Sequence, residues 1–215
     1  MKKYLIVLLL ALTSCVPANN THSILANQLC GKLCWNNIVV GTTTGQELLS
    51  IITALPHVNQ DSIKVFDEST GIFDGRVFFS LYKDSTGKQS LVKASAYTTD
   101  QKVVVIIFIG DLGIEFQDVV EAFGEPELVS AIWSHAGGID VSVLNSSQGI
   151  EFGFGAKSEK ASISPDTEIN MLKIFDTNLY RYLLESNWLI PGYEEFNLYA
   201  WSGYGEIEEH YWPPR

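Results

Sequence analysis

Paired carboxylates are the chemistry that this acidic chain offers most readily. Hydrolysis of a glycosidic bond uses two carboxyl groups roughly 5–10 Å apart, one as the acid and the other as base or nucleophile. Three acidic residues in or beside expected strands are the candidates for such a pair: Asp140, Glu151 and Glu206. They predict an enzyme or ligand-binding protein that acts on cell-wall or extracellular sugars or peptides.

The histidines do not follow a metal-ligand spacing. A catalytic metal commonly takes three protein ligands, often histidines. The sequence contains no His-x-x-x-His pair; its histidines are His22, His57, His135 and His210. Residues 206–210, Glu-Ile-Glu-Glu-His, form the one cluster of carboxylates with an imidazole. On a strand, Glu206, Glu208 and His210 would share a face, which predicts a solvated polar edge or, alternatively, a weak cation site.

Motifs for a nucleophile or a phosphate are absent from the sequence. There is no Gly-x-Ser-x-Gly elbow, no Gly-x-Gly-x-x-Gly turn and no Gly-x(4)-Gly-Lys loop. The glycines of residues 149–155 alternate with bulky residues, which predicts a strand packed closely against a helix. We therefore expect no metal and no cofactor, and a non-catalytic protein is favoured over an enzyme.

Cys15 has a chemistry of its own. It ends Leu12-Thr13-Ser14-Cys15, which follows a basic start and an apolar run from Tyr4 to Leu12. A basic start, an apolar core of about 7–15 residues and small residues before the cut are typical of a secretory signal, and this core is too short to span a bilayer. The four residues resemble the bacterial lipobox. That resemblance implies that Cys15 carries lipid, palmitate included, and becomes the first mature residue; an ordinary cleaved signal or an uncleaved anchor is the alternative.

The predicted location is the cell membrane or outer membrane, with the folded part outside the cytoplasm. Residues 1–14 are the expected lipoprotein signal peptide and residues 15–29 the tether, which is polar and contains Pro17. In this oxidising compartment Cys30 and Cys34 form an even pair, so a disulfide is expected. A redox-active pair or half of a metal site is the alternative.

Composition limits the class of protein and partner. Of the 215 residues, 46% are hydrophobic and 18% charged, which indicates a globular chain. The net charge of −11 and the lack of a basic run predict repulsion from phosphate, so we expect no nucleic-acid partner.

The order of elements predicts an α+β fold. Thr44 and Glu47 form a capping box for a short helix that Pro56 ends, and a second helical stripe runs from Phe116 to Phe123, with Gly124 as a left-handed cap. Expected strands follow each helix: 62–67, 76–83, 91–98 and 102–109, then 128–133, 139–144, 150–154 and 168–175. The glycine-rich segment 110–113 is expected to break the chain.

One domain, residues 30–215, is therefore expected to contain two tandem units of short helix plus antiparallel strands, about 30–110 and 111–175. A C-terminal helix (177–188) and an aromatic tail would form a helical cover, 176–215. Five aromatic residues here are candidates for partner binding, because Tyr and Trp are enriched in hot spots: Trp188, Tyr199, Trp201, Tyr204 and Trp212. The alternative is that they close the core. Trp35 and Trp133 are expected in the core.

Several of these motifs resemble known lipoproteins. The lipobox, the Gly-Thr-Thr turn into a helix, and Phe123-Gly124-Glu125-Pro126 before antiparallel strands are similar to the SmpA/BamE-like small lipoproteins. The tandem arrangement resembles the β-lactamase inhibitor protein architecture, and the segment Cys34-Trp35…Ile38…Gly41-Thr42-Thr43 resembles uncharacterised bacterial lipoproteins. This resemblance implies protein–protein binding and supplies no catalytic residue.

The sequence thus predicts two alternative functions. The favoured one is a membrane-anchored extracytoplasmic lipoprotein that acts as a protein-binding, assembly or inhibitor-like module on an envelope or extracellular protein. The alternative is an extracytoplasmic sugar- or peptide-binding protein or a cell-wall-acting hydrolase.

Overall fold

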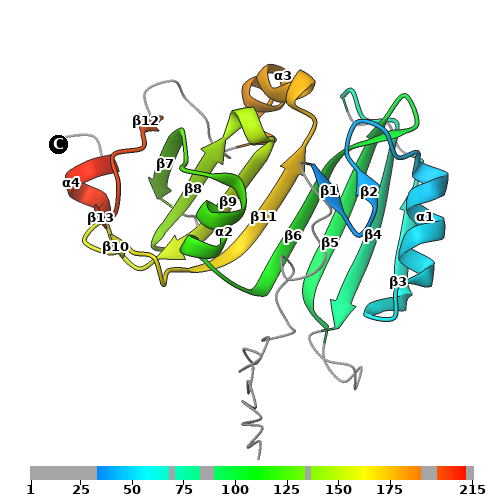
Figure 1. The fold of residues 1–215 in the computed structure, drawn as a ribbon, viewed down its shortest axis with the longest axis horizontal. Helices are drawn as coiled ribbons and strands as arrows, with labels where there is room; N and C mark the ends of the chain where they lie inside the picture. Colours follow the sequence, from blue (N-terminus) through cyan, green and yellow to red (C-terminus); the bar gives the residue numbers. More distant parts are fainter. Residues whose placement is uncertain (1–32, 68–70, 83–89, 134–136, 190–197, 212–215) are drawn as a thin grey trace, which may run out of the picture.

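A nine-stranded antiparallel sheet is the main element of the computed structural model, which describes residues 33–67, 71–82, 90–133, 137–189 and 198–211 (Figure 1). In sheet order the strands are β12 (Tyr199–Ala200), β7 (Leu128–Trp133), β8 (Ile139–Asn145), β9 (Ile150–Ala156), β11 (Glu168–Phe175), β6 (Lys102–Glu115), β5 (Ser90–Thr99), β4 (Gly75–Tyr82) and β3 (Val58–Phe66).

Two meanders build this sheet. Strands β3 to β6 follow one another in the chain and in the sheet, and so do β7 to β9. Strand β11 then enters between β9 and β6, antiparallel to both, so that Lys173 lies opposite Ile107 on one side and Glu151 on the other. Strand β11 thereby joins the last strands of the two meanders, β6 and β9, into one continuous sheet.

The predicted α+β fold of two tandem units is wrong, because the protein is mostly β. Helices in the described part of the chain are few and short: α1 (Gly45–Ala54), α2 (Phe116–Phe123), α3 (Tyr180–Glu185) and α4 (Ile207–Tyr211). The physical reason lies in β6, where residues 103–108 are all buried. A strand that is apolar on both faces cannot stand at the edge of its own unit, and pairing with β11 places it in the interior.

Local signals predicted the two longer helices correctly. The Thr44 hydroxyl accepts a hydrogen bond from the Glu47 amide at 3.2 Å, and the Glu47 carboxylate accepts one from the Thr44 amide at 2.8 Å. The hydrogen bonds that the Thr44 amide and the Thr44 hydroxyl donate to the Glu47 carboxylate lower the pKa of that carboxyl. Helix α2 ends at Gly124, whose φ of +85° favours glycine, although its ψ of 177° lies outside the left-handed helical region expected for it.

Two predictions about where elements break or end were wrong by several residues. Residues 110–113 do not break the chain, because β6 continues to Glu115 and buries Leu112 and Ile114. A register shift between Ile169 and Met171 of β11 absorbs the irregularity, as a β-bulge does. The helix expected at 177–188 is reduced to a 3-10 turn at Thr177–Leu179 followed by α3.

The two faces of the sheet are covered unequally. The hairpin of β1 (Cys34–Trp35) and β2 (Ile38–Val39) lies over the first face together with α1 and α2 (Figure 1). Trp35 is fully buried there, as expected, whereas Trp133 is 56% exposed, which corrects its placement in the core. A separate two-stranded sheet pairs β10 (Ser162–Ile163) with β13 (Gly205–Glu206).

On the second face, a smaller apolar cluster covers only the centre of the sheet. It joins Leu183 and Leu184 of α3, and Leu189, to Val105, Ile107 and Phe175 of the central strands. The part of this face that lies over β6 to β9, beyond that cluster, carries the site described next. None of the helices in the described ranges is long and apolar enough to cross a membrane.

Candidate binding site on the second face of the sheet

Two neighbouring rows of side chains run across the second face of the sheet. The cross-strand register places Ile107, Lys173, Glu151 and Leu144 in the central row. The outer row is one step of two residues further along each strand, and the same register gives its members: Ile109, Met171, Gly153, Ser142 and Ser130. The central row contains a buried ion pair, Lys173 with Glu151. The outer row contains three small residues, Gly153, Ser142 and Ser130.

A buried ion pair occupies the central row. Lys173 Nζ donates to both carboxylate oxygens of Glu151, at 3.1 and 3.0 Å, and to the Trp188 carbonyl at 2.8 Å. Glu151 is 0% and Lys173 4% exposed. Burial raises the pKa of the Glu151 carboxyl, against the opposing effects of the Lys173 charge and of hydrogen bonds from Lys173 and Ser142. All three ammonium protons therefore have acceptors, and the pair attaches the segment after α3 to the sheet.

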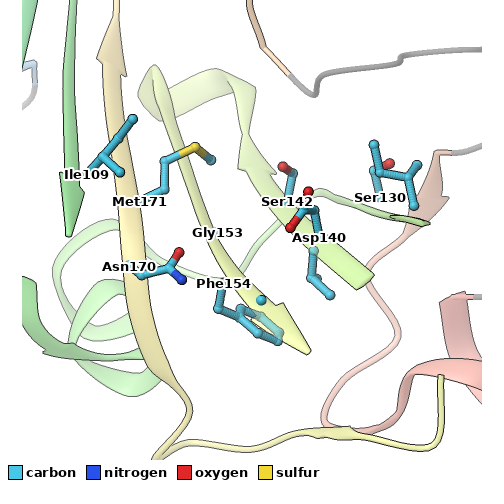
Figure 2. Close-up of a pocket in the computed structure, with 11 residues that line it drawn as sticks. Ile109, Ser130, Asp140, Ser142, Gly153, Phe154, Asn170 and Met171 are labelled. Atoms are coloured by element: carbon cyan, nitrogen blue, oxygen red, sulfur yellow. The ribbon is translucent and has the colours of Figure 1, made fainter. Parts of the chain in front are cut away.

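A hollow of about 240 Å³ lies over the outer row. Figure 2 shows Ile109 and Met171 on one side of the Gly153 strand and Ser142, Asp140 and Ser130 on the other. Its lining comes from five adjacent strands: Ile109, Asn170, Met171, Gly153, Phe154, Gly155, Asp140, Val141, Ser142, Ser130 and Ile132. Glycine and serine make the floor low, and the larger side chains form its sides.

The two glycines of the floor differ in what surrounds them. A Cβ on Gly153 would lie 2.8 Å from the Val141 carbonyl oxygen and 2.9 Å from Met171 Cε, so a side chain does not fit there. A Cβ on Gly155 would meet no atom within 4 Å, because it would project into open space. Gly153 is thus required by packing, whereas Gly155 only keeps the hollow empty.

Ser130 brings an unusual group to this hollow. It is 1% exposed, and its hydroxyl has no hydrogen-bond partner among the residues that the structure describes. Buried polar side chains nearly always have a partner, and an orphaned one costs about 1–3 kcal/mol. Its cross-strand neighbour Ser142, in contrast, bonds to Glu151. The lining therefore holds one satisfied and one unsatisfied hydroxyl side by side.

The rim of the hollow combines apolar and polar side chains. Ile109 is 54% exposed, an unusual value for an isoleucine in a central strand. Asp140 and Asn170 are exposed as well, and Ile132 is half-buried. An apolar hollow with a few polar groups is the usual form of a binding site.

The predicted carboxylate pair is not brought together. Glu151 is fully buried and paired with Lys173, and Asp140 lies at the rim of the hollow. Leu144, which is opposite Glu151, is four residues from Asp140 along β8, so the two acids are about 13 Å apart along the strands. Glu206 lies in β13, in the two-stranded β10–β13 sheet. Asp140 and Glu151 therefore do not form the predicted pair.

The acidic cluster at 206–210 also differs from its expected form. Glu206 ends β13, and α4 begins at Ile207, so the three polar residues do not continue along one strand. His210 Nδ1 lies 3.1 Å from the Ser202 hydroxyl. Within the described ranges, no three or more His, Cys, Asp or Glu residues are grouped so that they could hold a metal ion.

The candidate aromatic residues are mostly packed. The Trp188 ring lies edge-on to Phe73 and Tyr97, with centroids 4.5 and 4.6 Å away. Trp201 stacks on Phe116 at 5.3 Å and donates from Nε1 to Glu125 at 2.8 Å.

Two of the remaining candidates are less deeply placed. Tyr199 lies in β12 and is partly buried against the larger core, whereas Tyr204 is 40% exposed. Trp212 lies outside the described residues. Of the aromatic candidates that the structure describes, Tyr204 is thus the most available to a partner.

The cysteine predictions fall largely outside the described chain. Cys15 and Cys30 lie in the segment that is not described, and Cys34 is buried in β1. Lipidation of Cys15 and the Cys30–Cys34 bridge therefore stay predictions.

The hollow itself was not predicted from the sequence. The alternating glycines were interpreted as a strand packed against a helix, but Gly153 and Gly155 line an open hollow instead. The sequence did contain a signal, because small residues recur at every second position in several strands. Recognising that these residues lie side by side requires the register of β7, β8 and β9.

No protein-family model, no curated protein and no solved structure matches this chain. The resemblance to small lipoproteins accordingly remains a prediction. The function has to be inferred from the geometry of the second face.

Proposed function

We propose that this protein is a membrane-anchored, extracytoplasmic binding module that takes a protein partner on the second face of its sheet and has no catalysis of its own. The observation that carries this proposal is the hollow beside the exposed Ile109. Hydrophobic side chains of central strands are normally covered, and an apolar surface with a polar rim is typical of a protein-binding patch.

The surroundings of the hollow support binding over catalysis. Its lining contains one carboxylate, Asp140, while Glu151 is used in the ion pair with Lys173. Acid–base hydrolysis needs a second group within reach, and the described lining supplies none. A rigid sheet is, on the other hand, a suitable support for an interface because its side chains are held in fixed rows.

Membrane attachment is the second part of the proposal, and it rests on the lipobox-like Leu12-Thr13-Ser14-Cys15. Several acyl chains at Cys15 would hold the protein at the membrane, since a single chain gives only marginal binding. A Cys30–Cys34 disulfide would then tie the tether to the first covered strand. The partner is accordingly proposed to be an envelope or extracellular protein.

The test is crosslinking in the cells that make the protein. A photo-crosslinking amino acid is placed at Ile109 of the full-length chain, and the matched control carries it at Gln46, an exposed residue of α1 over the other face. We expect a discrete envelope protein to be captured from position 109 and not from position 46. A Cys15→Ser version, which cannot be lipidated, is expected to lose the capture.

A blocking variant makes the experiment specific for the hollow. A Cβ at position 155 meets no atom within 4 Å, so Gly155→Leu is expected to project into the hollow and abolish the crosslink while the protein still folds. Equal capture from both positions, or capture that Gly155→Leu leaves unchanged, would rule out this face as the binding surface.

A further inference from the structure

We infer that the hollow receives a tyrosine side chain of the partner protein, with the ring over Gly153 and Gly155 and the phenol hydroxyl bonded to Ser130. This inference rests on the proposed function and adds the chemistry of the anchoring group. It comes from three properties of the hollow: its volume, the shape of its lining and the orphaned hydroxyl.

The volume fits one ring. An engineered apolar cavity of roughly 150 Å³ binds benzene, and the hollow measures about 240 Å³. The additional space accommodates the phenol oxygen and the Cβ that connects the ring to a partner backbone.

The shape of the lining suits a flat group. Gly153 and Gly155 of β9 have no side chains, so none rises from β9 at these two positions between β11 and β8. Figure 2 shows Gly153 between Met171 and Ser142. The flexible thioether of Met171 lies beside Gly153, and sulfur makes favourable contacts with the edge of an aromatic ring. Ile109 is exposed at the same side and would cover the outer part of the ring.

The hydroxyl of Ser130 selects among the rings. It can donate one hydrogen bond and accept others, and in the described structure it does neither. Because the oxygen is itself buried, the Ser130 side chain must change its χ1 rotamer to present the hydroxyl to a ligand in the hollow. A phenol hydroxyl also donates and accepts, so it satisfies Ser130 whichever way the proton points. Phenylalanine and leucine would leave Ser130 orphaned, and the indole of tryptophan would leave the serine proton without an acceptor.

A cationic anchor is the strongest competitor. Asp140 stands at the rim and would attract an arginine or lysine of the partner. It is exposed and therefore well solvated, so it offers little to a group that must be desolvated in the hollow. The orphaned group is a hydroxyl, and a neutral hydroxyl is its natural complement.

The test pairs matched probes with matched variants. N-acetyltyrosine amide and N-acetylphenylalanine amide differ by one hydroxyl, and N-acetylarginine amide represents the cationic competitor. Binding to the full-length protein in lipid nanodiscs is measured by NMR titration, with empty nanodiscs subtracted. Probes of this size are expected to bind with dissociation constants on the order of 1 mM.

We expect the tyrosine probe to bind about three- to tenfold more tightly than the phenylalanine probe, the range of one net hydrogen bond. Ser130→Ala is expected to remove that preference and leave phenylalanine binding unchanged. Ser95→Ala, at a buried serine of the same face outside the hollow, is expected to keep it. Gly155→Leu is expected to abolish binding of both probes.

Equal affinities of the two ring probes, a preference that survives Ser130→Ala, or tighter binding of the arginine probe would overturn the tyrosine anchor. These outcomes are distinct from failure of the proposed function. If crosslinking from Ile109 captures a partner that Gly155→Leu blocks, binding on this face stands even where the ring probes fail. If no partner is captured but the tyrosine probe binds as expected, the hollow is a small-ligand site instead.

Discussion

The two rows on the second face use buried polar groups in opposite ways. In the central row, Lys173 and Glu151 satisfy each other, and the Trp188 carbonyl takes the last ammonium proton. In the outer row, two residues further along the strands, Ser130 is as deeply buried and has no partner in the described structure. The central row attaches the segment after α3 to the sheet. The outer row leaves a buried hydroxyl without a hydrogen-bond partner beside the hollow.

The difference follows from what covers each row. Trp188 and Leu189 lie over the centre and exclude water from the ion pair, and a buried charge is tolerated only when all its hydrogen bonds are made. A neutral hydroxyl without a partner costs far less, about 1–3 kcal/mol. Such a group can be kept for a binding partner that satisfies it, whereas an unpaired buried charge could not.

The largest effect is expected from breaking the ion pair. Lys173→Met leaves the Glu151 carboxylate buried without its counter-charge and should lower the free energy of unfolding by about 3–5 kcal/mol, measured by urea denaturation. The double variant Lys173→Met/Glu151→Leu should recover most of that loss. Lys93→Met, at an exposed lysine of the same face, should change stability by no more than about 0.5 kcal/mol.

The pH dependence sharpens this prediction. Without Lys173, burial acts on Glu151 largely unopposed, so the folded-state pKa of the carboxyl rises further above its ordinary value of 4.5. The folded variant then holds a proton that the unfolded chain releases, and its stability falls as pH rises. The difference in unfolding free energy between Lys173→Met and the unchanged protein should therefore become smaller at acid pH. A difference that stays constant with pH would show that Glu151 is not the buried, unpaired carboxylate that destabilises the variant.

The two glycines of the floor separate packing from function. Gly153→Ala places a methyl group 2.8 Å from a backbone oxygen and should cost about 1–3 kcal/mol. Gly155→Ala enters open space and should leave stability unchanged or raise it by about 0.5 kcal/mol, because alanine reduces the freedom of the unfolded chain. Thermal unfolding of the two single variants measures these changes in stability. Similar losses of stability at positions 153 and 155 would contradict the geometry of the floor.

Substitution of the two serines of the outer row should affect stability differently. Ser142→Ala removes a hydrogen bond to the buried Glu151 and should cost about 1 kcal/mol. Ser130→Ala removes an unsatisfied hydroxyl and should leave the unfolding free energy unchanged or raise it by up to about 1 kcal/mol. A clear loss in Ser130→Ala would mean that the hydroxyl already has a partner in solution.

Sequence reasoning was accurate where the signal is local. The capping box at Thr44, the end of the second helix at Gly124 and the strand at 128–133 each depend on residues that are close in the chain. The Cys15 and Cys30 predictions share this local character but lie outside the described residues.

What depends on distant pairing was missed. That β6 pairs with β11, and so joins both meanders, involves residues more than 50 positions apart. The hollow depends on the same kind of information, since Gly153, Ser142 and Ser130 share a row only through the register of three strands. The exposure of Trp133 could not be foreseen either, because hydrophobicity predicts burial only on average.

The smallest expected effect concerns the covered face, which has an orphan of its own. His57 lies edge-on to Trp35 with ring centroids 6.2 Å apart, and its Nε2 is buried without a partner in the described chain. Burial lowers the pKa of His57 below its ordinary value of 6.5. Between the two pKa values the unfolded chain binds a proton that the folded protein does not, so this contribution to stability is full above pH 6.5 and declines as pH falls below it.

Replacing the ring by His57→Phe keeps the contact with Trp35 and removes the titrating group. The fall in stability between pH 6.5 and pH 5 should then become shallower, as urea denaturation across that range would measure. Ser130→Ala, which removes an orphan that does not titrate, should leave the slope unchanged; an equal slope in all three proteins would mean that His57 is solvated in the folded state.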